Sequence, residues 1–200
     1  YVVALVVPDL TNAVFTELMR GIEVEAGERG YVVLLARAES LQPGGESLRR
    51  LLGEGRVDGL MVQVGDEAAG AELAALIEGT VPAILINSTL SGHVGSVILQ
   101  DEAGSRVAVE HLLGLGHRSI GLINGSPETA TARRRLAGFQ AAMADAGLKP
   151  AAVTFLGYEP EQGRAALREM MAAPDRPTAV VVSNVNAALG ALLEARTLGI

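Results

Sequence analysis

The chain has 200 residues, no cysteine and a formal net charge of −7 at pH 7. This charge argues against direct binding of nucleic acid by these residues, because phosphate contacts require clustered Lys and Arg. The lack of cysteine excludes disulfides, thiolate catalysis and zinc–thiolate sites. Hydrophobic residues make up 49% of the chain but aromatic residues only 3%. The core must therefore consist of Ala, Val, Leu and Ile, which favours a parallel sheet buried on both faces.

The first half of the sequence alternates short apolar runs with segments of helical periodicity. Asn12 is a predicted helix N-cap, and apolar residues follow it at helical spacing as far as Gly30. The other predicted elements are strands at 2–7, 31–36, 59–64 and 83–87 and helices at 47–53 and 68–78. Because the joints between them are short, this alternation predicts a doubly wound parallel sheet, an α/β fold.

A stretch rich in Ser, Thr and Gly at 88–95 interrupts the alternation, and the short run 96–99 after it is predicted to be an edge strand. We therefore expect two similar doubly wound lobes, residues 1–98 and 99–200. In the second lobe we predict strands at 119–124, 153–156 and 178–183 and helices at 103–115, 136–146, 162–172 and 187–198. Four helices end at a glycine that is expected to adopt the left-handed cap conformation, namely Gly30, Gly116, Gly147 and Gly199.

The sequence shows no arrangement of residues that is typical of an enzyme. The histidines His93, His111 and His117 lack metal-ligand spacing, and we expect a structural role for His117. No serine lies in a nucleophile elbow, and no pair of carboxylates stands out as an acid and a base. No apolar run is long enough to span a membrane. We therefore expect a binding protein without a metal, a cofactor or a membrane anchor.

The stretch 130–148 is predicted to be a cationic loop that leads into an amphipathic helix. Arg135 is expected where this helix begins, at the carboxyl end of a strand, and open α/β sheets bind ligands at that edge. A guanidinium offers a planar fork of donors for carboxylates, phosphates or paired hydroxyls. We predict that Arg135 anchors a ligand. For Arg133 and Arg134, a solvated helix start is an equally good interpretation.

Polar side chains also follow several of the predicted strands, namely Asp9, Asn12, Gln63, Asn87, Asn124 and Asn184. Any one of them could simply cap the next helix. Together they predict a polar crevice between the lobes that encloses a small hydrogen-bonding ligand. Phe15 and Tyr158 could provide apolar faces for this ligand, although each could instead pack in a core.

Six segments of the chain resemble the effector-binding domain of the LacI/GalR (lac repressor) family of bacterial transcription regulators. They are VVPDLTNAVFTELMRGIEVEAGERGYVVLLA, RVDGLMVQ, VEHLLGLGHRSIGLING, TARRRLAGFQAAMADAGL, RPTAVVVSNVNAALGAL and ARTLGI. The resemblance covers essentially the whole chain, and the combination of LGHRSIGLI with RLAGFQAAM is specific to these regulators. Periplasmic sugar receptors share the opening motif but match the middle of the chain less well.

The resemblance implies a periplasmic-binding-protein-like fold of type I and a cytoplasmic repressor that acts as a homodimer. In this family a small effector, often a sugar or sugar derivative, closes the two lobes and changes the geometry of the dimer on operator DNA. The resemblance also implies that the chain lacks the N-terminal helix-turn-helix region that binds the operator. The C-terminal segment that returns to complete the sheets is expected to be missing as well.

The resemblance also assigns residues to the effector site. Arg135 matches the family arginine that contacts the effector, and Tyr158 matches a position where an aromatic ring often stacks on it. Phe15 matches the aromatic residue at the start of the first helix. By the resemblance, Asn87 and Asn184 at strand ends and Thr131 on the loop before Arg135 also line the site. Asp9 and Gln63 are further candidates because of their positions at strand ends.

Three positions depart from the family pattern. Val185, Gln100 and Asn87 stand where an aspartate is common, and such carboxylates accept hydrogen bonds from ligand hydroxyls. Each charge-assisted bond that is lost is worth about 1.5–3 kcal/mol, so a neutral hexose should bind weakly. We therefore expect a less hydroxylated or an anionic effector, for example a sugar phosphate, a sugar acid or a nucleobase-like compound.

The main alternative function is a periplasmic solute-binding receptor of a sugar transport system. Such a receptor would use the same crevice but act as a monomer. A regulator needs a dimer to contact two half-sites of an operator, so the oligomeric state separates these two functions. An enzyme is the weakest of the three hypotheses, because no catalytic arrangement was found.

Overall fold

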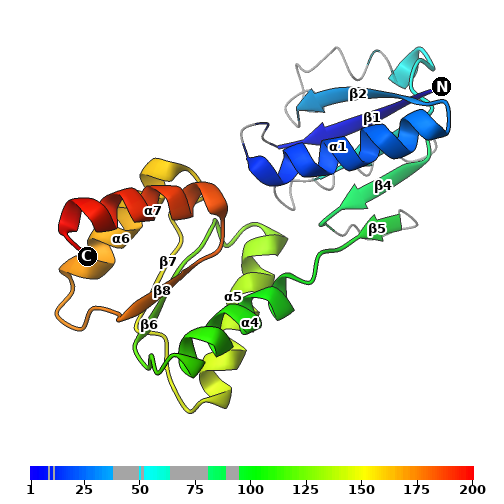
Figure 1. Ribbon diagram of the computed structural model, residues 1–200. Helices are drawn as coiled ribbons and strands as arrows, with labels where there is room; N and C mark the ends of the chain where they lie inside the picture. Colours follow the sequence, from blue (N-terminus) through cyan, green and yellow to red (C-terminus); the bar gives the residue numbers. More distant parts are fainter. Residues whose placement is uncertain (9, 11, 38–49, 51, 64–80, 89–94) are drawn as a thin grey trace. The chain divides into compact units, whose positions relative to one another are not determined.

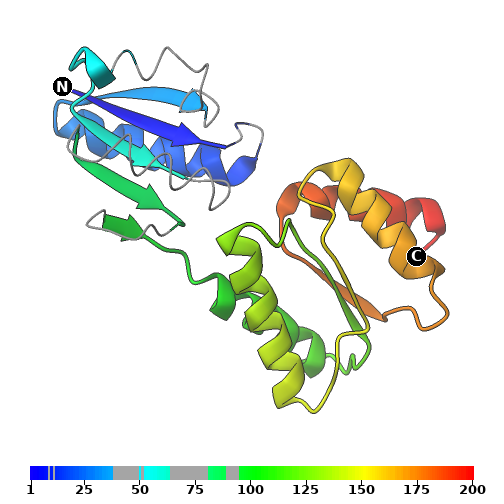
Figure 2. The ribbon, with the colours of Figure 1, turned by 180° about the vertical axis from the view of Figure 1, so that it is seen from behind.

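The computed structural model describes residues 1–8, 10, 12–37, 50, 52–63, 81–88 and 95–200. The chain divides into two compact units, Tyr1–Leu99 and Gln100–Ile200 (Figures 1 and 2). Each unit contains one sheet whose strands are all parallel. This confirms the predicted α/β class. No helix among the described residues has the length and apolar character needed to cross a membrane.

The sheet of the first unit has the strand order β2-β1-β3-β4-β5. Its strands are β1 (Val2–Val7), β2 (Val32–Arg37), β3 (Gly59–Val62), β4 (Ala83–Ile86) and β5 (Gly95–Val97). The short β5 lies at the edge of the sheet, as predicted for the run around Val97. The predicted helix at 68–78 lies outside the described residues.

Side chains of β1 alternate between the two faces of this sheet, which is why the strand is a continuous apolar run. Leu5 and Val7 point toward helix α1 (Ala13–Glu28) and pack against Phe15. Ala4 and Val6 belong to a separate cluster on the opposite face. Helix α1 begins at the predicted N-cap, because Oδ1 of Asn12 accepts a hydrogen bond from the Val14 N–H at 3.2 Å.

The second unit places helices on both faces of a smaller sheet with the strand order β7-β6-β8 (Figure 1). Its strands are β6 (Ile120–Ile123), β7 (Ala152–Thr154) and β8 (Ala179–Val182). Helices α4 (Asp101–Gly114) and α5 (Ala130–Asp145) pack on the face that includes Ile120 and Leu122. Helices α6 (Pro160–Ala172) and α7 (Val185–Leu198) pack on the face that includes Ile123.

The four predicted cap glycines all have positive φ, with values of 75°, 92°, 69° and 73° for Gly30, Gly116, Gly147 and Gly199. His117 lies in the turn between α4 and β6, and its Nδ1 is 3.0 Å from Oγ1 of Thr178, which confirms a structural role. These features show that the ends of the elements follow local sequence signals.

Glycines bring α6 and α7 into close contact. A Cβ on Gly163 would lie 2.0 Å from the carbonyl oxygen of Ala187, and a Cβ on Gly190 would lie 1.8 Å from that of Pro160. Any larger residue at either position must therefore push the two helices apart.

We expect Gly190→Ala to lower the free energy of unfolding of the second unit by about 2–3 kcal/mol, because overpacking forces backbone shifts. Gly104→Ala in α4 is the matched control, since a Cβ there meets nothing within 4 Å. This control should be neutral or stabilising by about 0.5–1 kcal/mol, because alanine favours a helix over glycine. Urea denaturation of both variants measures the difference, and equal stabilities would contradict the close packing of α6 on α7.

A buried ion-pair network also joins α6 to α7. Glu194 of α7 is only 1% exposed, and it accepts hydrogen bonds from Nε of Arg168 at 2.7 Å and Nε of Arg164 at 3.2 Å. The hydrogen bond from Arg168 is the largest cause of a pKa of Glu194 below its ordinary value of 4.5, although burial by itself raises this pKa. The network therefore stabilises the folded unit at neutral pH, and this contribution is lost as the pH falls below 4.5 through the lowered pKa.

Candidate functional site

Helix α5 begins at Ala130, six residues before the predicted start at Leu136, so the arginine run is helical and not a loop. The prediction that Thr131 lies on a loop before Arg135 was therefore wrong. Thr129 is the N-cap, and its Oγ1 accepts a hydrogen bond from the Ala132 N–H at 3.3 Å. A threonine in this position is a recognised start signal. The later predicted start came from the apolar periodicity, which begins only at Leu136.

The protein itself holds the guanidinium of Arg135 in place. Nε and Nη2 of Arg135 both lie 2.9 Å from Oδ1 of Asp101, and Nη1 donates a hydrogen bond to the carbonyl oxygen of Ser183 at 2.6 Å. Ser183 directly follows β8. Arg135 therefore lies at the carboxyl edge of this sheet, as predicted, with its side chain 22% exposed.

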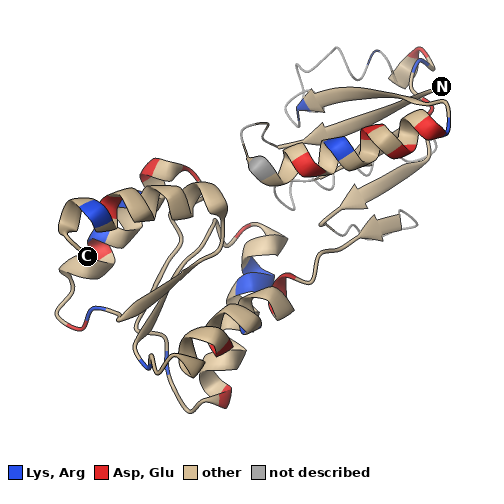
Figure 3. Cartoon of the chain, in the orientation of Figure 1, with Lys and Arg blue, Asp and Glu red and all other residues tan. Residues whose placement is uncertain are grey.

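Asp101 accepts hydrogen bonds from a second arginine as well. Nη2 and Nε of Arg134 lie 2.8 and 3.2 Å from Oδ2 of Asp101, whose side chain is only 3% exposed. In Figure 3 the basic first turns of α5 lie beside the acidic start of α4. Arg134 is therefore not part of a solvated helix start. Arg133 is exposed, and its Nη1 donates to the carbonyl oxygens of Pro127 and Glu128, both at 3.0 Å.

Asp101 was not predicted as a functional residue from the sequence. Gln100 stands where an aspartate is common in the family, and a carboxylate is present one residue later, at the first position of α4. The available signal was an acidic residue in the first turn of a helix, where the helix dipole favours negative charge. Sequence spacing alone could not show that this carboxylate meets arginines more than thirty residues away.

Two asparagines at strand ends hold the same edge together. Asn124, which is fully buried after β6, donates from Nδ2 to the carbonyl oxygen of Ala132 at 2.9 Å. Its Oδ1 accepts a hydrogen bond from Oγ of Ser183 at 2.7 Å. Asn184 is the N-cap of α7, because its Oδ1 accepts hydrogen bonds from the N–H groups of Asn186 and Ala187 at 2.8 and 3.4 Å. Asn184 therefore has the capping role that was left open as an alternative, whereas Asn124 bridges neighbouring segments instead of capping a helix.

Tyr158 also lies at this edge of the second unit. Gly125 directly follows Asn124, and a Cβ on Gly125 would lie only 2.2 Å from Cζ of Tyr158. The ring therefore occupies space that only a glycine leaves open. The Tyr158 hydroxyl is buried and has no hydrogen-bond partner within the described part of the chain. Buried hydroxyls are normally satisfied, so this group is a candidate donor to a ligand.

The first unit places its predicted residues in different surroundings. Phe15 is only 5% exposed and packs with Leu5 and Val7, which is the core-packing alternative. Gln63 and Asn87 directly follow the neighbouring strands β3 and β4 at the carboxyl edge of the sheet. Oδ1 of Asn87, whose φ is 52°, accepts a hydrogen bond from the Leu99 N–H at 3.3 Å. Asp9 lies outside the described residues.

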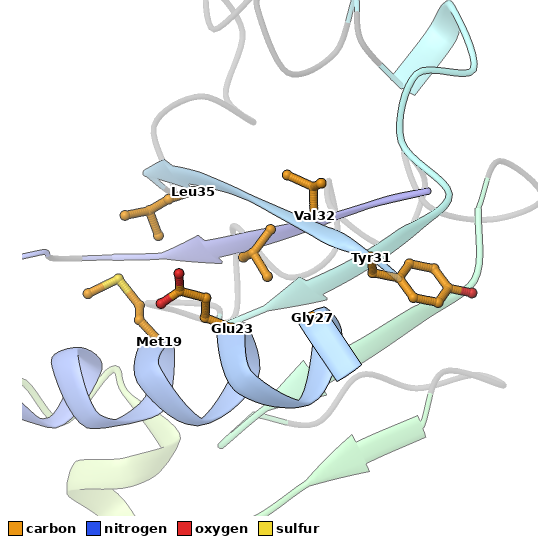
Figure 4. Close-up of a pocket in the computed structure, with 7 residues that line it drawn as sticks. Met19, Glu23, Gly27, Tyr31, Val32 and Leu35 are labelled. Carbon is orange, nitrogen blue, oxygen red and sulfur yellow. The ribbon is translucent and has the colours of Figure 1, made fainter. Parts of the chain in front are cut away.

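Two grooves in the first unit flank α1 and contain none of the predicted site residues. One has a volume of about 430 Å³ and lies between α1 and β2 (Figure 4). Figure 4 shows the carboxylate of Glu23 pointing from α1 toward β2. The other groove, of about 700 Å³, lies over β1, β3 and β4. Their linings are mostly apolar, so the candidate site for a polar ligand remains the carboxyl edges of the sheets.

Comparison with known proteins decides the family. The family model described as "Periplasmic binding proteins and sugar binding domain of LacI family" matches residues 1–200. The chain belongs to this family. The match confirms the LacI/GalR resemblance and the periplasmic-binding-protein-like fold.

Among LacI-family relatives, the chain is similar to proteins named HTH-type transcriptional repressor PurR. It is 28% identical to that of Aliivibrio salmonicida (strain LFI1238) over 203 residues, which cover 99% of this chain and 60% of the relative. It is 31% identical to that of Escherichia coli O139:H28 over 194 residues, which cover 94% of this chain and 56% of the relative. The chain therefore spans little more than half the length of these curated relatives.

Among solved structures, the chain is similar to a LacI family transcriptional regulator from Mycobacterium smegmatis. The two are 43% identical with a TM-score of 0.84, and the match covers 98% of this chain and 73% of the other. These relatives are named as transcriptional regulators and not as enzymes.

Proposed function

We propose that this chain is the effector-binding domain of a cytoplasmic, ligand-responsive transcriptional repressor. The observation that carries the proposal is a guanidinium, that of Arg135, fixed at the carboxyl edge of a parallel sheet in a chain that matches the LacI family over its whole length. The repressor names of the relatives support the same function. The effector is a small molecule, either a sugar, a sugar phosphate or acid, or a nucleobase-like compound.

We propose that Arg135 and Tyr158 contact the effector in the second unit. The support for Arg135 is its position and its remaining donors, and the support for Tyr158 is its buried hydroxyl. Thr131 lies in the first turn of α5, and Asn184 is the N-cap of α7 at the same edge. In the first unit, Gln63 and Asn87 are the described strand-end candidates, Asp9 is a candidate from the sequence, and Phe15 supports β1 from the core.

We further propose that the full-length protein is a homodimer that binds operator DNA through a helix-turn-helix region outside this chain. The outer face of α7 supports self-association. Val185, Leu189, Leu192 and Leu193 are 51%, 54%, 67% and 57% exposed, and residues 185–193 include no charged side chain (Figure 3). Exposed apolar stripes of this kind mark protein interfaces, and a two-fold axis would pair the stripe with its own copy.

The function is tested on the full-length protein with DNA from its own upstream region, by fluorescence anisotropy. We expect specific binding that is lost in high salt, and a shift in affinity when an effector from a panel of sugars, sugar phosphates, sugar acids and nucleobases is added. Binding of a solute by a protein that neither binds DNA nor dimerises would contradict the proposal and favour the transport receptor.

A further inference from the structure

Asp101 has no capacity left to accept hydrogen bonds from a ligand. A carboxylate offers about four lone-pair directions. Nε and Nη2 of Arg134 approach Oδ2, and Nε and Nη2 of Arg135 approach Oδ1, at distances of 2.8 to 3.2 Å. The side chain is also 3% exposed, so solvent and ligand have little access to it. This carboxylate therefore cannot replace the acceptors that a polyhydroxyl ligand needs.

Three other oxygens at this edge also accept hydrogen bonds from within the fold. Oδ1 of Asn184 accepts two N–H groups of α7, and Oδ1 of Asn124 accepts the hydroxyl of Ser183. The carbonyl oxygen of Ser183 accepts Nη1 of Arg135. These three oxygen atoms at the carboxyl edge of the second unit are therefore already used by the fold.

Donors, in contrast, remain available. A guanidinium has five N–H groups, and the contacts to Asp101 and Ser183 account for one each on Nε, Nη1 and Nη2 of Arg135. The second N–H on Nη1 and the second on Nη2 have no partner among the described residues. The hydroxyl of Tyr158 is a further buried donor at the same edge.

We propose that the effector carries an anionic oxygen group, a carboxylate or a phosphate, that accepts the two remaining terminal N–H groups of Arg135. Asp101 is a positioning residue that fixes the guanidinium, and its negative charge weakens binding of the anion. This inference rests on the proposed function, because it names the ligand class of the same site. It makes the affinity for anions depend on the charge at residue 101.

The test uses the full-length protein and inorganic phosphate as the probe, with binding measured by calorimetry at low ionic strength. Asp101→Asn keeps an oxygen that can face Arg135 but removes the charge, so we expect phosphate to bind about tenfold more tightly than to the wild type. Glu102→Gln is the matched control, because it removes the same charge from the next, exposed residue of α4. This control should change the phosphate affinity less than twofold.

A second comparison, between Arg135→Gln and the wild type, tests the inference even if the Asp101→Asn variant does not fold. The single variant Arg135→Gln should bind phosphate at least tenfold more weakly than the wild-type protein does. Its circular dichroism spectrum should be unchanged. Acetate, as a second probe, distinguishes a carboxylate site from a phosphate site, because the preferred anion should show the larger response to both substitutions.

Equal phosphate affinity in the wild type, Asp101→Asn and Arg135→Gln would overturn the inference, and so would the absence of phosphate binding in all three. DNA binding measured in parallel separates this outcome from failure of the proposed function. A protein that binds its operator but shows no anion site contradicts only the inference. A protein with the anion site but without DNA binding contradicts only the proposed function.

Discussion

Arg135→Ala should abolish effector binding, with a loss of at least 100-fold in affinity, while the second unit stays folded. The effector would lose a charged donor at the edge of the sheet, and hydrogen bonds that involve charged groups are among the strongest that a site can offer. Folding should survive, because Asp101 keeps the two contacts from Arg134 and is not left unpaired. Calorimetry with the effector identified from the panel in the anisotropy experiment measures the affinity, and thermal unfolding measures the stability.

Arg133→Ala is the matched control for this variant. It removes the same side chain from the same helix, but from an exposed position two residues away. Nη1 of Arg133 donates hydrogen bonds to the backbone carbonyl oxygens of Pro127 and Glu128. Effector affinity in this control should stay within about threefold of the wild type. An Arg135→Ala protein that binds the effector as well as the control would remove Arg135 from the site.

If the full-length protein is the dimer that we propose, Leu189→Lys should convert it into monomers and abolish operator binding. Leu189 lies in the middle of the apolar stripe on α7 and is 54% exposed. In a two-fold symmetric interface each substitution acts twice, and two buried charges would face each other across the axis. We expect the dissociation constant of the dimer to rise by at least about 100-fold, since loss of interface hot spots costs 2 kcal/mol or more each. Sedimentation velocity measures the change.

Val107→Lys provides the comparison for this experiment. Val107 is on α4 of the same unit and is 63% exposed, so the same chemical change is made at an equally exposed apolar position on another helix. This variant should remain dimeric and bind DNA normally. Dimers that persist in Leu189→Lys, or dissociation in both variants, would show that the outer face of α7 is not the interface.

The departures from the family pattern take on a different meaning once the contacts are known. The sequence indicated the loss of acceptor carboxylates at Val185, Gln100 and Asn87, and from this it predicted a less hydroxylated or anionic effector. The structure adds that the neighbouring carboxylate, Asp101, is saturated by two arginines. Both observations reduce the number of acceptors for ligand hydroxyls, so they favour the same class of effector for independent reasons.

Local patterns in the sequence determined most of the fold. Alternating side chains on β1, the N-cap at Asn12 and the cap glycines are each specified by a few neighbouring residues, so the parallel α/β class and most described elements could be predicted. Arg135 could also be placed, because it belongs to a motif at the end of a strand. The start of α5 was missed where a weaker local signal, Thr129, competed with the apolar periodicity.

The partners of the charged groups were decided only by the tertiary structure. Asp101 meets Arg134 and Arg135, and Glu194 meets Arg164 and Arg168, across pairs of helices whose packing depends on glycines such as Gly138 and Gly190. The sequence does not show which charged residues lie close together, because their distances are set only when these helices pack. For this reason the sequence by itself determined the family, the sheets and the position of Arg135 at the end of a strand, whereas the folded chain decided which side-chain oxygens are already paired.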